Sequence, residues 1–504
     1  MTAVNRLMGV DIGAGSVKTT IISTDGRVVG DASMEIATRH PKPGWTEQDP
    51  DEWYSAMCAT VPRALQKAGL CGADVAAISF SAGAHTPVLL DEADKPLRPA
   101  ILWSDQRSGA EARHLSERHG GMILATGCNQ PNPTWTLPQL AWLQKHEPHI
   151  GQKTRKLMVA KDYLRFRLTG EWHTDRTDAI GTLLYDASND CWSREICDLI
   201  NWRLATLHPV VSPTAIIGTV GSRAAAETGL AVGTKVVCGT SDTSIESFGA
   251  GAVESGAGCV KLATAATVSV VAASPTIHSI LINYPYAVPG LWYTIVATNS
   301  CASAHKWLRD SVFAATDDRA FAHYDRAAAD IAAGSEGLLF HPYLNGERSP
   351  YWDPLLRADF IGLTMAHGQA HLTRALYEGI AYSLRDCLSA LRAQGLDMSE
   401  ARIVGGGSKS ALWRRIVCDV LAMPISMPAV TDASFGAALL AGVGAGIFAD
   451  EISAARACVE IAARHEPDPA SAATYTEMFG IYKDAQSRLA DINHRLHHVA
   501  VGGL

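Results

Sequence analysis

Two stretches that lie far apart in the chain share one pattern: an apolar strand, a turn of small residues and a second strand. The first stretch covers residues 8–23, with its turn at 13–16, and the second covers residues 259–272, with its turn at 263–266. Strands joined so closely pair with each other, and helical segments follow each pair. The pattern therefore predicts an α/β protein that contains two related domains.

The composition is typical of a soluble globular protein, with 504 residues, 47% hydrophobic and 19% charged, and a net charge of −8. A mildly acidic surface repels phosphate backbones and anionic lipid, so we expect neither nucleic acid nor a membrane as a partner. Residues 1–6 lack a signal-peptide core, and no apolar stretch is long enough to span a bilayer. We therefore expect a cytoplasmic protein, and its eleven scattered cysteines indicate reduced thiols.

An apolar run at residues 235–238 leads through Gly239 to Asp242. Active sites of open α/β sheets lie at such strand ends. An Asp after Gly-Thr-Ser is also common as a turn residue or helix N-cap, and the position alone favours that structural role. The glycine-rich turns before and after it, each suited to part of a nucleoside triphosphate, make Asp242 our candidate for the centre of function.

Two glycine-rich turns are candidate nucleotide contacts. In the first, Gly13 and Ser16 allow a phosphate to approach the backbone, and Lys18 adds a positive charge. A dinucleotide-binding fingerprint is a weaker alternative, because a strand rather than a helix follows these glycines. In the second, three glycines at 405–407 separate a short strand from a helix, which permits close approach of a polar or negative ligand. A structural tight turn is the alternative there.

Two strand ends in the first half carry residues suited to a hydroxyl-rich ligand. Ala84 and His85 follow one apolar strand at a glycine turn, and Trp103, Asp105 and Arg107 follow another apolar run. An aromatic ring can cover a sugar face while a carboxylate and a guanidinium exchange hydrogen bonds with hydroxyls. A structural histidine, and a surface ion pair beside a core tryptophan, are the alternatives that these residues leave open.

Taken together, these stretches resemble the FGGY family of carbohydrate kinases, and most closely its xylulokinase branch. The resemblance is carried by GVDIGAGSVK, GWTEQDPDEWY, RPAILWSDQR, AKDYLRFRLTGEW, TDRTDAIGTLLYD, GTSDT, NGERSPYWDP, DFIGLTMAHGQAHLTRALYEGIAYSLRD and VGGGSKSALWRRIVCD, which cover essentially the whole chain in this order. It implies an α/β fold of two ribonuclease H-like, actin-like ATPase domains flanking a deep cleft. Residues 1–245 would hold mainly the sugar, and residues 246–504 mainly ATP.

The resemblance also implies roles for individual residues. Asp242 matches the catalytic base, and Asp11 matches the carboxylate that helps to hold Mg²⁺ through water. With the reasoning above, the predicted sugar-binding residues are Ala84, His85, Trp103, Asp105 and Asp242. The predicted ATP-binding residues are Asp11, Gly13, Ser16, Lys18, Thr264, Gly405, Gly406 and Ser410.

The chain departs from the family pattern at several of these places. Ala14 stands where the first turn usually has Thr or Ser, and Ala263 and Ala265 flank the threonine of the second turn. The usual Ser-Gly-Gln-Met-His-Gly of xylulokinases reads Ser-Ala-Gly-Ala-His-Thr at residues 81–86, and Gln139 replaces a lysine of the first family signature. We expect a reshaped sugar pocket and fewer hydroxyl contacts to phosphate.

The resemblance implies ATP-dependent phosphorylation of a sugar primary hydroxyl, with D-xylulose giving its 5-phosphate as the expected reaction. It also implies a homodimer. The alternative within the family is a kinase for another polyol or ketose, such as ribulose, erythritol, glycerol or a heptulose. Outside this reaction, the alternatives are an actin- or chaperone-like ATPase without a sugar acceptor and a sugar-binding module that has lost catalysis.

Overall fold

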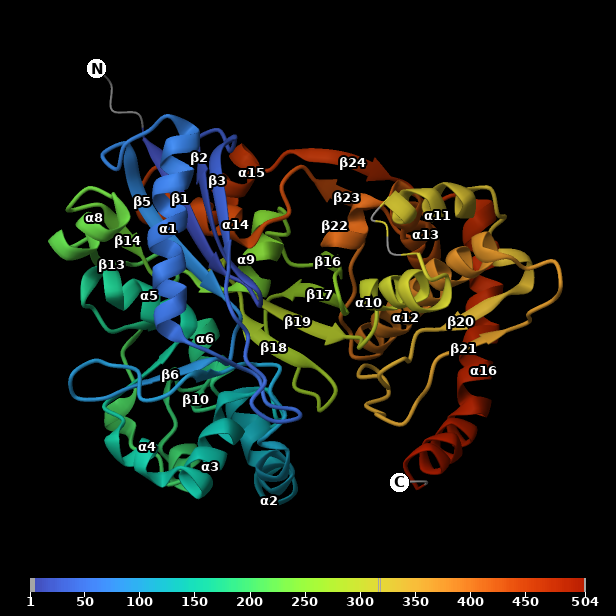
Figure 1. Cartoon of the computed structure of the whole chain (residues 1–504), viewed down its shortest axis with the longest axis horizontal. Helices are drawn as coiled ribbons and strands as arrows, with labels where there is room; N and C mark the ends of the chain where they lie inside the picture. Colours follow the sequence, from blue (N-terminus) through green and yellow to red (C-terminus); the bar gives the residue numbers. More distant parts are fainter. Residues whose placement is uncertain (1–4, 316, 318, 503–504) are drawn as a thin grey trace. The chain divides into compact units, whose positions relative to one another are not determined.

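The structure, a computed structural model, describes residues 5–315, 317 and 319–502 (Figure 1). Residues 1–6, for which the sequence predicted no signal-peptide core, lie partly outside these ranges. The chain divides into two compact units. Unit 1 comprises residues 1–253, 273–293 and 430–460, and unit 2 comprises residues 254–272, 294–429 and 461–504. The chain first passes from unit 1 to unit 2 after residue 253, and two later segments, residues 273–293 and 430–460, belong to unit 1. The domain boundary after residue 245 stays a prediction.

Unit 1 contains a mixed sheet whose strands run in the order β13-β14-β5-β1-β2-β3, with β15 also paired to β5. These strands are β1 (Arg6–Ile12), β2 (Ser16–Ile22), β3 (Val28–Glu35), β5 (Val75–Ala82), β13 (Ile216–Thr219), β14 (Lys235–Val237) and β15 (Thr240–Ser241). β1 pairs antiparallel with β2 but parallel with β5. A tight turn at residues 24–26 joins β2 to β3, and Gly26 has a φ of 84°, which glycine adopts without strain.

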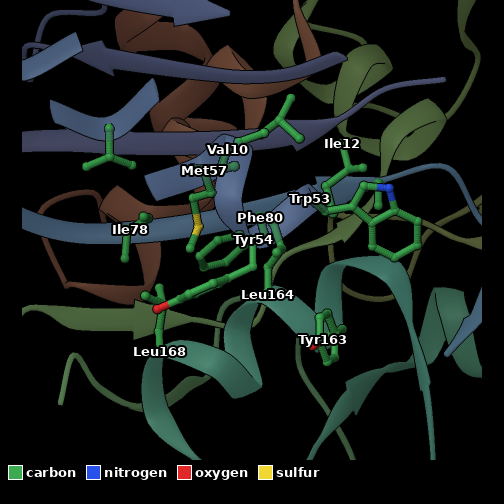
Figure 2. Packing of buried hydrophobic residues seen from close by; sticks show 14 of the residues in the cluster. Val10, Ile12, Trp53, Tyr54, Met57, Ile78, Phe80, Tyr163, Leu164 and Leu168 are labelled. Carbon is green, nitrogen blue, oxygen red and sulfur yellow. The ribbon is translucent and has the colours of Figure 1, made fainter. Parts of the chain in front are cut away.

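Helices cover both faces of this sheet. Val10 of β1 packs with Met57 and Leu164 in one buried cluster (Figure 2). Because side chains alternate along a strand, Gly9 faces the other side, where an added Cβ would lie 1.9 Å from the carbonyl oxygen of Ser434. The first face carries α1 (Pro50–Ala68) and α5 (Ala160–Thr169), and the second carries α14 (Ala433–Gly444). In Figure 1 the orange α14 accordingly lies beside the blue β1.

The other elements of unit 1 are shorter strands in small pairs and helices between them. The paired strands are β4 (Glu47–Gln48), β6 (Pro87–Leu90), β7 (Ala100–Ile101), β8 (Lys156–Val159), β9 (Thr174–Asp175), β10 (Tyr185–Asp186), β11 (Cys191–Trp192) and β12 (Val210–Val211), and a further strand, β18 (Ile282–Pro285), belongs to none of these pairs. The helices are α2 (Gly109–Gly127), α3 (Thr136–His146), α4 (Pro148–Lys153), α6 (Arg176–Gly181), α7 (Arg194–Leu199), α8 (Ser222–Thr228), α9 (Asp242–Gly249) and α15 (Glu451–Cys458).

Unit 2 repeats the strand–turn–strand pattern in a sheet whose full order is β18-β19-β17-β16-β22-β23-β24. The strands of unit 2 in this sheet are β16 (Ala257–Leu262), β17 (Ala266–Ala272), β19 (Trp292–Ala297, of which residues 294–297 belong to unit 2), β22 (Glu400–Val404), β23 (Ile425–Pro428) and β24 (Ile461–His465), and β20 (Leu339–His341) and β21 (Asp359–Ile361) form a separate pair. Its helices are α10 (Ala302–Trp307), α11 (Arg319–Ala329), α12 (Gln369–Ala393), α13 (Ala411–Leu421) and α16 (Pro469–Gly502).

The helix α10 ends at Trp307, and a π-helical segment, Leu308–Val312, continues it. Over the residues that the structure describes, no helix combines the length and the apolar character that crossing a bilayer requires.

Candidate active site

Asp242 is the first residue of α9 and follows β15 directly. Its Oδ1 accepts a hydrogen bond from the backbone N–H of Thr243 at 2.6 Å, whereas no described group donates to its Oδ2. Because β15 pairs with the end of β5, Asp242 lies beside Gly83, and a Cβ built on Gly83 would be 3.9 Å from Oδ2. The side chain is partly exposed. One carboxylate oxygen at this strand end can therefore accept a proton from a ligand.

Trp103 lies against the same glycine. Its side chain is 43% exposed, and its ring would be 3.2 Å from a Cβ on Gly83. A larger residue at position 83 would therefore occupy the space between the ring and Asp242. Gln139, buried in α3, donates from Nε2 to the carbonyl oxygen of Leu102 at 3.2 Å and so contacts the backbone next to Trp103. The arrangement leaves an open aromatic face close to a free carboxylate oxygen.

His85 is buried at the end of the same turn, and Ala84 beside it is partly exposed. The imidazole stacks on Trp135 with 4.0 Å between ring centroids, and its Nε2 lies 2.7 Å from the hydroxyl of Tyr284. Burial lowers the pKa of His85 to about 3, so the ring is neutral at physiological pH. Tyr284 in turn stacks on Tyr293. The sequence reasoning singled out His85 but not these aromatic neighbours.

Asp105 is completely buried, and both of its oxygens are used by protein donors. Oδ1 accepts from the N–H and the Nε of Arg107 at 2.8 and 2.9 Å, and Oδ2 accepts from the N–H of Thr46 at 2.5 Å. Arg107 also pairs with Glu47 at 2.7 Å. In this structure the carboxylate fixes the loop behind Trp103, and its direct contact with a sugar stays a prediction.

Asp11, at the end of β1, forms the centre of a group of acidic side chains. Its Oδ1 accepts a hydrogen bond from the hydroxyl of Ser81 at 2.5 Å. Burial, and to a smaller extent the nearby negative charges of Asp242, Asp432 and Glu246, together raise its pKa to about 8. A divalent cation would offset this charge. Within the described ranges, no three His, Cys, Asp or Glu side chains are close enough together to hold a metal directly.

The first predicted phosphate turn joins β1 to β2. The N–H of Gly13 donates to the carbonyl oxygen of Ser16 at 2.9 Å and closes the turn. Lys18 follows on β2 and forms an ion pair with Asp432, whose Oδ1 also accepts from the hydroxyl of Ser434 at 3.0 Å. Asp432 is thus the N-cap of α14 and the partner of Lys18. The sequence reasoning missed it, although an Asp two residues before a Ser at a helix start is a recognisable capping signal.

The second predicted phosphate turn, in unit 2, joins β16 to β17. The side chain of Thr264 is exposed, and its carbonyl oxygen accepts from the N–H of Cys301 at 3.0 Å and from the hydroxyl of Ser303 at 2.7 Å. These bonds tie the turn to the start of α10. Thr264 is therefore an exposed residue in a turn whose backbone is held by hydrogen bonds.

The predicted adenosine loop follows β22 in unit 2. Gly405 has a φ of 88°, and an added Cβ would lie 2.6 Å from the carbonyl oxygen of Leu262, so only glycine fits. At Gly406 an added Cβ would meet nothing within 4 Å. Ser410 is the N-cap of α13: it accepts from the N–H of Trp413 at 2.9 Å and donates to Asp325. Its contact with ATP, like the other predicted nucleotide contacts, stays a prediction.

Comparison with known proteins places this geometry in context. Residues 6–249 match the N-terminal domain of the FGGY family of carbohydrate kinases, and residues 252–445 match its C-terminal domain. A xylulose kinase from Staphylococcus epidermidis is 31% identical over 95% of each chain. A gluconokinase from Bacillus subtilis is 29% identical over 94% of each chain. The crystal structure of a xyloylose kinase from Brucella ovis is 31% identical, with a TM-score of 0.89 over 97% of this chain and 100% of that one.

Proposed function

Since the chain belongs to the FGGY family of carbohydrate kinases, we propose that this sugar kinase phosphorylates a ketopentose such as D-xylulose, giving the 5-phosphate. The family model confirms the resemblance drawn from the sequence, and the solved relatives confirm the α/β kinase fold. ATP is the phosphoryl donor that membership of this family implies. The identity of the acceptor is our inference.

The observation that carries the proposal is the convergence at Gly83 of an open tryptophan ring and a carboxylate oxygen without a donor. The ring of Trp103 suits the apolar face of a sugar, and Oδ2 of Asp242 suits a hydroxyl proton. In the proposed reaction, that oxygen takes the proton of the primary hydroxyl as the hydroxyl oxygen bonds to the terminal phosphorus of ATP. The bond from phosphorus to the leaving oxygen of ADP breaks.

The acidic group around Asp11 fits Mg²⁺ held through water. Burial and the neighbouring carboxylates both raise the pKa of Asp11, yet the acidic side chains do not form a direct cage of three ligands in the described residues. Mg²⁺ commonly keeps several waters and binds through one or two carboxylates. When bound with the nucleotide, the ion would neutralise phosphate charge. In this proposal, Asp11 orients the ion's water shell.

A neutral acceptor suits the side chains around Gly83 and His85 better than gluconate, the acid named by the gluconokinase relative. The side chains around Gly83 and His85 are Trp103, Asp242, Trp135 and Tyr284, and none of them is a cation. His85 itself is kept neutral by its burial. An aldonate would bring a carboxylate close to Asp242 without a compensating charge from this group.

An acceptor panel tests the proposal. The purified protein would be assayed for ADP release with ATP, Mg²⁺ and, in turn, D-xylulose, ribulose, erythritol, glycerol, a heptulose and gluconate. We expect the highest kcat/KM with D-xylulose. A higher value with another acceptor would reassign the substrate, and sugar-independent ADP release would favour an ATPase. Sugar binding without ADP release would indicate a module that has lost catalysis.

A further inference from the structure

A group of charged side chains is buried inside unit 1 behind the strand end that carries Asp242. Lys161 is its centre: Nζ lies 2.7 Å from Asp162 and 2.9 Å from both Asp175 and Asp178. Arg165 pairs with Asp162 at 3.0 Å. The side chains of all five are at most 2% exposed. So many charges are rarely withdrawn from water unless each is paired, and these pairs hold β9, α5 and α6 together.

Two hydrogen bonds connect this group to the segment that leads into Asp242. The hydroxyl of Thr240 donates to Oδ2 of Asp175 at 2.7 Å. One guanidinium nitrogen of Arg165 donates to the carbonyl oxygen of Cys238 at 2.7 Å. Thr240 and Cys238 lie two and four residues before Asp242, so the charged group holds the approach to the carboxylate at two points.

The segment needs such support because the strand is interrupted there. β14 ends at Val237, and pairing with β5 resumes only at Thr240. Between them, Gly239 has a φ of 76°, and an added Cβ would lie 2.0 Å from the carbonyl oxygen of Phe80. The N–H of Gly239 donates to the carbonyl oxygen of Pro213 instead of a neighbouring strand. The shape of the bend therefore depends on bonds from outside the sheet.

We propose that Asp175 is a positioning residue for Asp242: oriented by Lys161, it holds the Thr240 hydroxyl and thereby sets where the Asp242 carboxylate points. This inference rests on the proposed kinase function and adds a residue to that site. A purely structural role makes a different prediction, because loss of a buried bond would then lower stability and leave the turnover of folded enzyme unchanged. A misplaced reacting group lowers kcat instead.

Thr240 is the residue to change, because Asp175 also accepts from the N–H of Thr177 as the N-cap of α6. Thr240→Val removes the hydroxyl and keeps the shape of the side chain. Thr240→Ser restores the hydroxyl, and Thr240→Ala provides a second variant without it if the valine enzyme does not fold. Thr228→Val is the matched control, since the hydroxyl of Thr228 is equally buried but donates at 2.7 Å to the carbonyl oxygen of Ala224 within its own helix.

The measurement is steady-state kinetics with the best acceptor of the panel, per mole of folded enzyme as determined by circular dichroism. For Thr240→Val we expect kcat to fall between about tenfold and a hundredfold, with the KM for sugar changed less than about twofold. Thr240→Ser should recover most of the loss. Thr228→Val should lower the melting temperature while leaving kcat as in the wild type.

The outcomes separate the two proposals. An unchanged kcat in folded Thr240→Val, or in Thr240→Ala where only that variant folds, would overturn the positioning role and leave the kinase function standing. A rise in the KM for sugar without loss of kcat would also overturn it. A wild type that phosphorylates none of the panel would overturn the proposed function, and the role of Asp175 with it.

Discussion

The two strand–turn–strand hairpins share a frame but carry opposite charges at the same place. In unit 1, Asp11 is the residue before the last of β1, and it faces Lys18 across the hairpin. In unit 2, the corresponding residue of β16 is Lys261, and it faces Thr267. The first hairpin thus carries an acidic side chain at this place, whereas the second carries a basic one. The same hairpin structure therefore carries an acidic residue in unit 1 and a basic residue in unit 2. The candidate catalytic base, Asp242, lies in unit 1 with the acidic residue.

Among the changes that test this comparison, we expect the largest loss of activity at Asp242. Asp242→Asn should lower kcat by about a thousandfold, because an amide cannot take the hydroxyl proton, while binding of sugar and ATP persists. Sugar kinase assays with calorimetric binding would measure both. Glu117→Gln, on the exposed side of α2, removes one carboxylate elsewhere in unit 1 and should leave kcat unchanged. Near-normal turnover in the asparagine variant would show that Asp242 is not the catalytic base.

In unit 2 the expected effect concerns the backbone of the loop after β22. Gly405→Ala should lower the free energy of unfolding by about 3 kcal/mol, since the new Cβ strains a positive φ and overlaps the carbonyl oxygen of Leu262. Chemical denaturation would measure it. Gly406→Ala introduces the same methyl group into open space and should cost less than about 0.5 kcal/mol. Equal losses in the two variants would contradict this account of the loop.

A variant of Trp103 tests whether unit 1 binds the sugar. Trp103→Ala should raise the KM for sugar about tenfold, because the open ring beside Gly83 is lost, and should leave the KM for ATP within about twofold. Varying each substrate at saturating levels of the other separates the two constants. Trp352, 41% exposed in unit 2, offers a control by Trp352→Ala, which should not change the KM for sugar. A parallel rise in both constants would indicate general distortion.

The last prediction concerns a pH dependence of stability that originates in unit 2. Burial raises the pKa of Glu347 to about 8 from the usual 4.5, so between these values the folded protein keeps a proton that the unfolded chain releases. Stability from this group is therefore complete below pH 4.5 and is lost as pH rises through 8, with a slope of up to about 1.4 kcal/mol per unit. Glu347→Gln should flatten the decline in unfolding free energy between pH 6 and 8. An unchanged slope would place the titration elsewhere.

The sequence predicted the local elements well because hairpins and amphipathic helices leave local signals. The repeated strand–turn–strand pattern and the apolar run before Asp242 were both recognised in this way. It could not show which protein groups surround a given side chain. Asp105 looked available for a ligand, yet donors from Thr46 and Arg107 occupy it, and only the fold brings Thr46 to that place. Tyr284 was missed for the same reason, since 199 residues separate it from His85.

The return of α14 to the first sheet has a consequence for biosynthesis. The absence of a side chain at Gly9 lets α14, which begins at Ala433, pack closely on β1. One face of the sheet therefore remains uncovered during synthesis until most of the polypeptide has been made. Nascent chains that have completed β1 to β5 carry exposed apolar surface, which is a target for chaperones and a risk for aggregation. We therefore expect a fragment that ends before residue 433 to be insoluble, even though it contains Asp242.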